Sequence, residues 1–273
     1  MKYVTTITLG FSLIVPSAVL AQSLDDDDQA GLRFTVSAGV ISAPTFLGDD
    51  EQQTSVVPNI TLSYGDRFTA GLDGVRYTVF SRAGFNAGIV GAYHFGRDEN
   101  PDDNPFVVSG GDTTDLVGLG DIDGTFELGG FLEYEAKQFS ARLELRQGID
   151  GGHDGLYGEA EVMYIGSFNA FERPVFFSVG PAIAFGDDAY NSTFFDVSAA
   201  QSAASGISQF DAGGGLISYG LHATAVVPLS ERTSLVGFVN YDQLTGDVGD
   251  SSIVQERGSE NQSTVGMFLN YTF

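Results

Sequence analysis

The sequence predicts an all-β protein: a transmembrane, antiparallel, up-and-down β-barrel of about twelve strands. Apolar and polar residues alternate with a period of two through most of the chain, which is typical of strands with one apolar face. The connections between these segments are short at one end and long and polar at the other, as in barrels that cross a membrane. The chain also ends on such a segment, with no polar tail after Phe273.

The N-terminus has the pattern of a secretory signal peptide, residues 1–21. Lys2 precedes an apolar run that is too short for a membrane-spanning helix, and cleavage is expected after Ala21. Residues 22–30 include four consecutive aspartates and predict a solvated acidic tail in the periplasm, because like charges repel one another. The barrel is expected over residues 31–273.

The composition excludes several classes of site. The chain has 12 Lys and Arg against 36 Asp and Glu, a net charge of −24, so no nucleic acid partner is expected, because phosphate binding depends on basic residues. We interpret the acidic excess as solvated loops. Without cysteine, an exported chain has neither disulfides nor a thiolate metal site, so its stability must come from a hydrogen-bonded sheet or a core.

Twelve segments carry the alternation, and no helix is expected. In residues 138–147, the clearest segment, Leu143 and Leu145 face one way and Arg142 and Glu144 the other. Most segments have 9 to 14 residues, which suits tilted membrane-crossing strands of ~9–11 residues better than soluble strands of ~5–6. The expected strands are residues 31–43, 54–64, 67–73, 75–81, 84–96, 122–135, 138–147, 155–167, 173–186, 214–228, 232–243 and 262–273.

The connections sort by length. With both termini on one side, the turns on that side have two to four residues, whereas the opposite connections include long polar loops at 97–121, 187–213 and 244–261. This is the layout of an outer-membrane barrel, whose closed sheet satisfies the backbone within lipid without leaving an edge. The short turns are expected at residues 65–66, 82–83, 136–137, 169–172 and 230–231.

Two sets of residues are assigned to the lipid face. Aromatic residues near strand ends predict the girdles that meet the membrane interfaces. They are Phe34, Tyr93, Tyr134, Phe139, Tyr164, Tyr219, Tyr241, Tyr271 and Phe273. The apolar face of the last strand is interpreted as the C-terminal signal that the barrel-assembly machinery recognises: Val265, Met267, Leu269, Tyr271 and Phe273.

The opposite face of three neighbouring segments carries a ladder of charges. Its members are Glu127, Glu133, Arg142, Glu144, Arg146, Glu159 and Glu161. A two-residue turn at 136–137 would pair Tyr134 with Phe139 and Glu127 with Arg146, with the charges inside the barrel. The ladder could line a selective pore or solute site, or its ion pairs could hold a narrow lumen together; we favour the second interpretation.

No catalytic, cofactor-binding or metal-ligating set is predicted. His94, His153 and His222 fall in separate elements, and no short motif combines Ser, His and an acid as acyl hydrolysis requires. Residues 120–124, GDIDG, resemble part of a calcium loop but lack its later ligands and final glutamate. A non-enzymatic protein without a cofactor is therefore expected.

Two long segments carry a resemblance to a known family. Residues 190–215 and 243–273 are similar to the long-loop and C-terminal signatures of the MipA/OmpV family of outer-membrane proteins. Shorter matches lie at Pro58, residues 64–68, Gly96, Arg97 and residues 151–156. Asp196 and Ser252 stand where the family usually has Gly and Pro, which affects the conformation of two outer loops.

The resemblance implies a barrel in the outer membrane of a Gram-negative bacterium. The family is named for interaction with a membrane-bound lytic transglycosylase and is proposed to scaffold it with a murein synthase. We therefore expect a scaffold for peptidoglycan-remodelling enzymes. Its expected partners are outer-membrane lipid, the barrel-assembly machinery, and a periplasmic or lipid-anchored murein hydrolase and synthase. The alternatives are a narrow porin-like channel or solute-uptake barrel with a charged lumen, and a surface adhesion protein.

Overall fold

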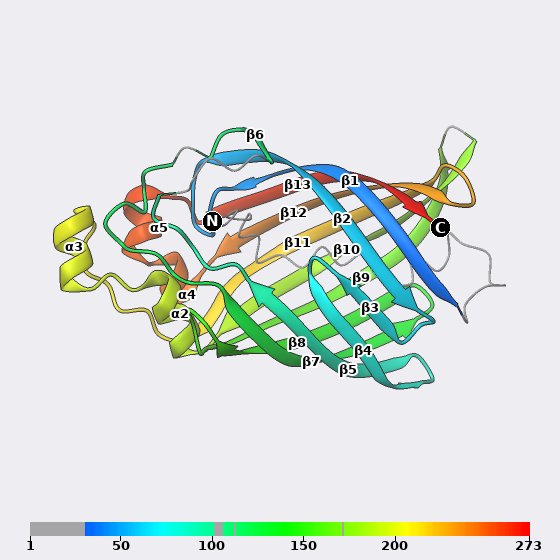
Figure 1. The fold of residues 1–273 in the computed structure, drawn as a ribbon, viewed down its shortest axis with the longest axis horizontal. Coiled ribbons are helices and arrows are strands. Elements are labelled where there is room, and N and C mark those ends of the chain that lie inside the picture. Colours follow the sequence, from blue (N-terminus) through cyan, green and yellow to red (C-terminus); the bar gives the residue numbers. More distant parts are fainter. Residues whose placement is uncertain (1–30, 101–105, 112, 171) are drawn as a thin grey trace.

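The computed structural model describes residues 31–100, 106–111, 113–170 and 172–273, so the predicted signal peptide and acidic tail lie outside the described residues. Its thirteen strands form one antiparallel sheet. β1 (Leu32–Pro44) pairs with both β13 (Asn261–Thr272) and β2 (Gln52–Tyr64), which closes the sheet into a barrel. β6 (Val107–Ser109) is a short addition to β2, so the barrel wall has twelve strands, as the sequence predicts (Figure 1).

The wall follows the chain, because successive strands pair with their sequence neighbours. Each predicted segment corresponds to one wall strand, and its ends agree within three residues. The remaining wall strands are β3 (Phe68–Gly71), β4 (Gly74–Arg82), β5 (Phe85–His94), β7 (Thr125–Ala136), β8 (Phe139–Asp150), β9 (Leu156–Ala170), β10 (Arg173–Gly186), β11 (Gly215–Pro228) and β12 (Thr233–Leu244).

The outer face of the wall is apolar. All nine predicted girdle residues are exposed on it, and Phe139 packs across strands against Tyr164, with 5.5 Å between ring centroids. Between the girdles, alternating residues such as Val40, Leu132 and Val239 are about half exposed. A continuous exposed apolar surface is rare on a soluble monomer, so this surface suits contact with lipid.

The short turns lie at the end of the barrel where the chain finishes (Figure 1). Between β4 and β5, Ala83 and Gly84 have φ of +53° and +83°, the backbone of a tight hairpin turn that matches strand twist. The turn between β7 and β8 is residues 137–138 rather than 136–137.

The predicted register between β7 and β8 is therefore wrong by two residues. Ala136 pairs with Phe139, and Glu127 pairs with Gly148 instead of Arg146. A shift of two residues keeps every side chain on its predicted face, because successive side chains of a strand point to opposite faces.

The β3–β4 hairpin is short and stops well before the far end of the barrel (Figure 1). β3 pairs with β2 only at Leu62, Ser63 and Tyr64, and β6 pairs with β2 at Thr54 and Ser55. On the side of β2 that faces away from β1, none of the described strands pairs with residues 57–61. The hydrogen-bonded wall is thus interrupted in its outer half, at an edge that includes Pro58, which has no N–H to donate.

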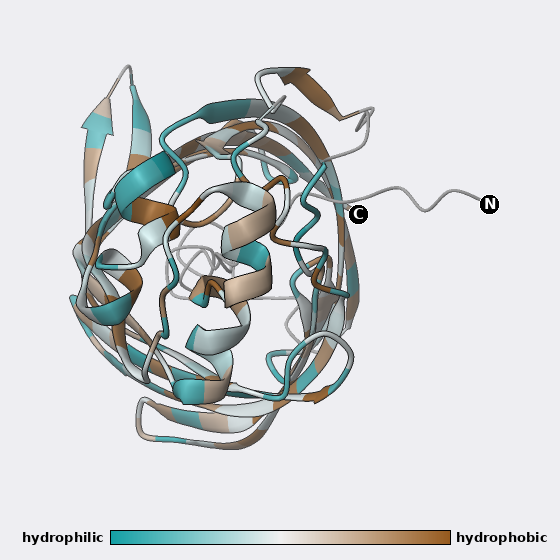
Figure 2. Ribbon diagram, turned by 90° about the vertical axis from the view of Figure 1, so that its left-hand side faces the viewer, coloured by the Kyte–Doolittle hydropathy of each residue, from teal (hydrophilic) through white to brown (hydrophobic). Residues whose placement is uncertain are grey.

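The long outer connections fold into a lid that contains helices, so the expectation of no helix is wrong. The helices are α2 (Asp188–Phe195), α3 (Ala199–Ser205), α4 (Gly246–Gly249) and α5 (Ser252–Arg257). Each has at most eight residues, too few to show a helical apolar period in the sequence. Within the described ranges, no helix is long and apolar enough to cross a bilayer. Figure 2 looks onto this end, where the helices lie across the mouth.

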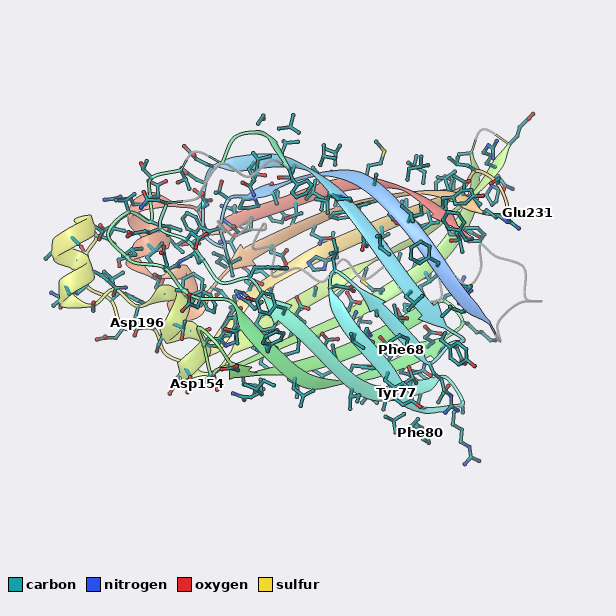
Figure 3. All side chains as sticks on the ribbon, in the orientation of Figure 1. Phe68, Tyr77, Phe80, Asp154, Asp196 and Glu231 are labelled. Carbon is teal, nitrogen blue, oxygen red and sulfur yellow. The ribbon has the colours of Figure 1, made fainter. Side chains whose placement is uncertain are left out.

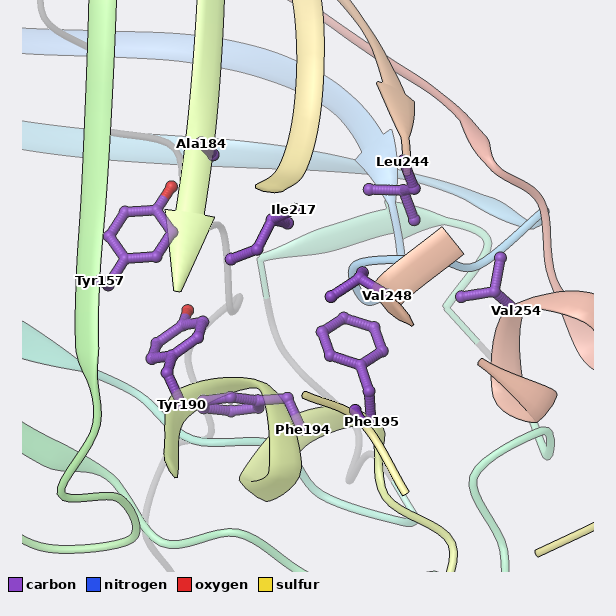
Figure 4. Packing of buried hydrophobic residues seen from close by; sticks show 10 residues of the cluster. Tyr157, Ala184, Tyr190, Phe194, Phe195, Ile217, Leu244, Val248 and Val254 are labelled. Atoms are coloured by element: carbon purple, nitrogen blue, oxygen red, sulfur yellow. The ribbon is translucent and has the colours of Figure 1, made fainter. Parts of the chain in front are cut away.

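Two clusters of buried apolar residues hold the lid to the barrel. In the first, Phe195 of α2 packs with Val248 and Val254 of the last loop and with Leu244 at the end of β12 (Figure 4). The second joins four outer loops, including those of the first cluster, through Phe46, Leu116, Leu119, Val197, Ile207 and Ile253. The outer mouth of the barrel is therefore covered by a packed apolar core.

Candidate functional site

The lumen holds a network of arginines and glutamates on the inward positions of β4, β7 and β8. Arg76 of β4 reaches across to Glu133 of β7 at 2.8 Å and to Glu144 of β8 at 2.6 Å. Arg142 contacts the same two glutamates, at 3.7 and 2.5 Å. The side chains of these four residues are at most 19% exposed, so the ion pairs are largely shielded from water.

Arg146 continues the network toward the lid. It lies 2.9 Å from Glu127 and 3.5 Å from Glu144. The predicted contact with Glu127 is formed although the two residues are not register partners, because the long arginine side chain reaches its diagonal neighbour. Each of the three lumen arginines thus contacts two carboxylates.

The seven predicted ladder residues all face inward, but they do not form one uniform ladder. Five of them take part in the ion pairs above. Glu159 instead accepts a hydrogen bond from Tyr157 Oη at 2.8 Å, and Glu161 is the register partner of Arg142. Arg76 was not among the predicted residues, although the alternation of Val75, Tyr77 and Val79, which are exposed, implies that Arg76 faces inward.

Among the other inward positions of the barrel, several are apolar and others, such as Ser178, Asp242 and Thr264, are polar. Ile165, Val226 and Val236 form one buried cluster, and Ile41, Phe238 and Phe268 another. The residues of these two clusters come from β1, β9, β11, β12 and β13. Charge is therefore concentrated on the β4–β9 side of the lumen, where the arginines link strands that are not neighbours in the wall.

Two histidines that the sequence places far apart meet beneath the lid. The rings of His94 and His153 are 5.5 Å apart, and His153 lies against Tyr190 and Phe194 of α2 at 5.2 and 5.6 Å. His153 Nε2 is 3.2 Å from Glu127 Oε1. The third histidine, His222, instead contacts Asp242 on the adjacent strand at 3.1 Å.

A cavity lies between this aromatic group and the lid. Its volume is about 70 Å³, and about 10–15 Å³ is enough for one water. Most of its wall is apolar or aromatic, and its charged lining residue is Arg97. The lining residues are Pro44, Phe46, Leu47, His94, Arg97, Tyr157, Ala184, Tyr190, Phe194, Phe195, Ile217, Ser218 and Gln262.

An acidic group lies in the lid near the β1–β2 loop. Carboxylate oxygens of Asp49, Asp50 and Asp115 lie within 4.8 Å of one another, a spacing that could hold a divalent cation. Asp49 is 1% exposed, and its burial raises the pKa of this carboxyl to about 6. Asp50 is exposed, and exposed acidic groups are common without a bound ion, so we assign no metal to this group.

The five residues interpreted as a C-terminal assembly signal share the outer face of the last strand. Val265, Met267, Leu269, Tyr271 and Phe273 are between 41% and 66% exposed. β13 pairs with β1 to close the barrel, so this apolar row lies beside the closing seam. Their role in assembly stays a prediction.

The family model described as MltA-interacting protein MipA matches residues 36–273. The chain belongs to this family. Together with the closed barrel, membership of the MipA family assigns the protein to the outer membrane of a Gram-negative bacterium. No curated protein sequence matches the chain.

Several solved outer-membrane proteins have similar structures at low sequence identity. CdiB from Acinetobacter baumannii is 8% identical, with 89% of this chain and 60% of that chain covered and a TM-score of 0.35. OprB from Pseudomonas putida is 11% identical, with 81% and 59% covered and a TM-score of 0.38. OprD from Pseudomonas aeruginosa is 11% identical, with 88% and 65% covered and a TM-score of 0.36. The chain spans less than two thirds of each of these proteins, and similarity at this level carries no functional argument.

Proposed function

We propose that this MipA-family barrel is a non-enzymatic membrane anchor that scaffolds peptidoglycan-remodelling enzymes, a murein lytic transglycosylase with a murein synthase, at its periplasmic end. The family description, MltA-interacting protein, supports a partner of this kind. The observation that carries the proposal is the closed interior. An apolar lid covers the outer mouth and each of the three lumen arginines is paired with two glutamates, which favours a role for the surface of the barrel over a role for its lumen.

The short-turn end of the barrel has the charge pattern of a docking surface. We call its exposed basic residues the periplasmic rim: Arg67, Arg82, Lys137, Arg173 and Arg232. Within the described ranges, three exposed acidic residues accompany them, Asp66, Glu172 and Glu231. Figure 3 marks Glu231 at this end and Asp154 and Asp196 at the lid end. In a chain of net charge −24, a rim with a basic excess supports the docking of a partner through an acidic face.

Because each turn is short, a partner must contact several turns together. A pull-down of the lytic transglycosylase by the refolded full-length barrel tests this, using the triple variant Arg67→Glu, Lys137→Glu and Arg232→Glu. Reversing three steering charges should weaken capture at least about tenfold at low salt. The matched control reverses acidic residues on the same rim, Glu172→Lys and Glu231→Lys, which increases the basic excess, and it should capture at least as well as the wild type.

Equal capture by the triple variant and the wild type would contradict docking through the rim. Deletion of residues 25–28 separately tests the acidic tail as a docking element. Gel mobility before and after heating shows whether each variant is a folded barrel, so a loss of binding is not confused with a loss of folding.

A narrow channel is the second candidate. The described barrel strands place five of the predicted ladder glutamates against three arginines in the lumen, and this excess of negative charge favours cations as its solute. Single-channel recording of the refolded protein in a planar bilayer separates the two functions. The scaffold proposal expects no steady conductance. A cation-selective current that changes in the Arg142→Ala, Arg146→Ala variant would instead support the channel.

A further inference from the structure

We propose that Arg97 binds the carboxylate of a small amphipathic organic acid, whose aromatic or aliphatic part occupies the cavity beneath the lid. This ligand site goes beyond the scaffold role and does not depend on it. Arg97 has a buried guanidinium with a hydrogen-bond donor left unused by the described residues, and it lines a mainly apolar cavity.

Arg97 is held firmly at the start of the long loop after β5. Its backbone exchanges hydrogen bonds with Ile122, at 2.9 and 2.7 Å, in an isolated antiparallel bridge. Its side chain is directed to the lid, where Nη1 donates to the carbonyl oxygen of Phe194 in the last turn of α2. The guanidinium therefore has a fixed position under α2.

The charge of Arg97 has no anionic partner among the described residues. Arg97 is only 9% exposed, and among the described carboxylates none lies within ion-pair distance of it. Its Nε has no hydrogen-bond partner. Removal from water alone lowers its pKa to about 10. A buried cation in this state is costly, because its lost hydration is only partly replaced.

The other arginines with buried side chains in the described part of the chain are satisfied differently. Arg76, Arg142 and Arg146 each contact two glutamates. In the Arg97 side chain, by contrast, only Nη1 donates a hydrogen bond, to the carbonyl oxygen of Phe194. Among the described residues, none accepts a hydrogen bond from the edge formed by Nε and Nη2. This edge of a guanidinium is well suited to bind a carboxylate through two parallel hydrogen bonds.

The rest of the cavity suits the apolar part of such a ligand. Phe46, Leu47, Phe194 and Ile217 supply apolar walls, and a binding site for a small molecule typically combines such walls with a few polar groups. A carboxylate would neutralise the guanidinium, and the attached ring or chain would leave water. The combination selects an organic anion over an inorganic anion or a neutral apolar molecule.

A purely structural role for Arg97 is the competing explanation. A basic side chain near the C-terminus of a helix stabilises it by bonding to the last carbonyls, and Arg97 does so with Phe194. If this contact were its whole role, substitution would loosen α2, but the wild-type protein would not distinguish an organic acid from its neutral analogue.

Calorimetric titration of the refolded full-length barrel with benzoate, and with benzamide as the neutral analogue, tests the proposal. We expect wild-type protein to bind benzoate at least about tenfold more tightly than benzamide. Arg97→Met should lose this preference, and Arg97→Lys, which keeps the charge without the planar fork, should weaken benzoate binding while retaining part of the preference.

Arg257→Met is the matched control. Arg257 is also a lid arginine and donates to the carbonyl oxygens of Asp115 and Ser205, but it does not line the cavity; this variant should bind benzoate within about twofold of the wild type. Three results would overturn the proposal: no binding of benzoate by the wild type, equal affinity of the wild type for benzoate and benzamide, or an Arg97→Met variant that keeps the full preference for benzoate over benzamide. If Arg97→Met does not fold, the wild-type comparison and Arg97→Lys still decide.

Discussion

Replacement of Arg76 by methionine should destabilise the barrel by about 2–3 kcal/mol. Removal of one partner from a buried ion pair costs about 3–5 kcal/mol, because the remaining charge stays desolvated. We expect a loss at or just below the low end of this range for two reasons. The side chains of Arg76 and Glu133 are 18% and 19% exposed, so water still reaches them. Arg142 also still contacts Glu144 at 2.5 Å. Glu133 is affected most, because its remaining contact with Arg142 is 3.7 Å long.

A double substitution tests whether the unpaired carboxylate causes the loss. The double variant Arg76→Met, Glu133→Gln has a neutral side chain at position 133, so no carboxylate there has lost its arginine. It should therefore be about 1 kcal/mol more stable than Arg76→Met alone. Arg82→Met is the matched control: Arg82 lies on the same strand and is exposed, and its substitution should change stability by less than about 0.5 kcal/mol.

Urea unfolding of the protein refolded in lipid vesicles, followed by circular dichroism, provides the measurement; the chain has no tryptophan. A loss for Arg76→Met as small as that for Arg82→Met would refute the reasoning. So would a double variant whose loss equals the sum of the two single losses, because that result would mean that the two side chains do not interact.

Two further predictions concern the lid. The pKa of Asp49 is raised from 3.8 to about 6, so the folded protein binds a proton that the unfolded chain releases, and lid stability should fall as pH rises from about 4 to about 6. Asn at position 49 should remove this dependence and raise the thermal midpoint at pH 7; a midpoint that rises with pH in the wild type would contradict the assignment. Phe195 is 1% exposed, and Phe195→Ala should cost about 3–5 kcal/mol of lid packing. The loss should appear as faster proteolysis within residues 188–205 while the barrel transition stays unchanged, and equal cleavage of variant and wild type would count against this packing.

The wall of the barrel could be predicted because its pattern is local. Alternation of side chains defines a strand and its two faces without knowledge of its partners, and this is why all twelve wall strands were found. The register between β7 and β8 could not be derived in the same way. Pairing with the turn at 136–137 or at 137–138 leaves the same residues facing lipid, so the pattern does not distinguish the two.

The lid was missed because it depends on contacts between distant segments. α3 does carry a local signal, since Ser198 and Gln201 form a capping box, but seven residues give no apolar period. The meeting of His94 with His153, and the burial of Arg97 under α2, arise only when the loops pack on the barrel. Arg97 has one sequence signal in retrospect: it is a basic residue within a long acidic loop.

The choice of arginine over lysine connects the lumen with the cavity. The chain has two lysines, Lys2 and the exposed turn residue Lys137, so each buried cation among the described residues is an arginine. A guanidinium can hold two carboxylates at once and is more weakly hydrated than an ammonium group. In the lumen that capacity is used by glutamates of the chain itself. At Arg97 the described residues supply a carbonyl oxygen and no carboxylate, although acidic residues are abundant in the same loop. An anion from outside the chain is the simplest partner for the edge that remains.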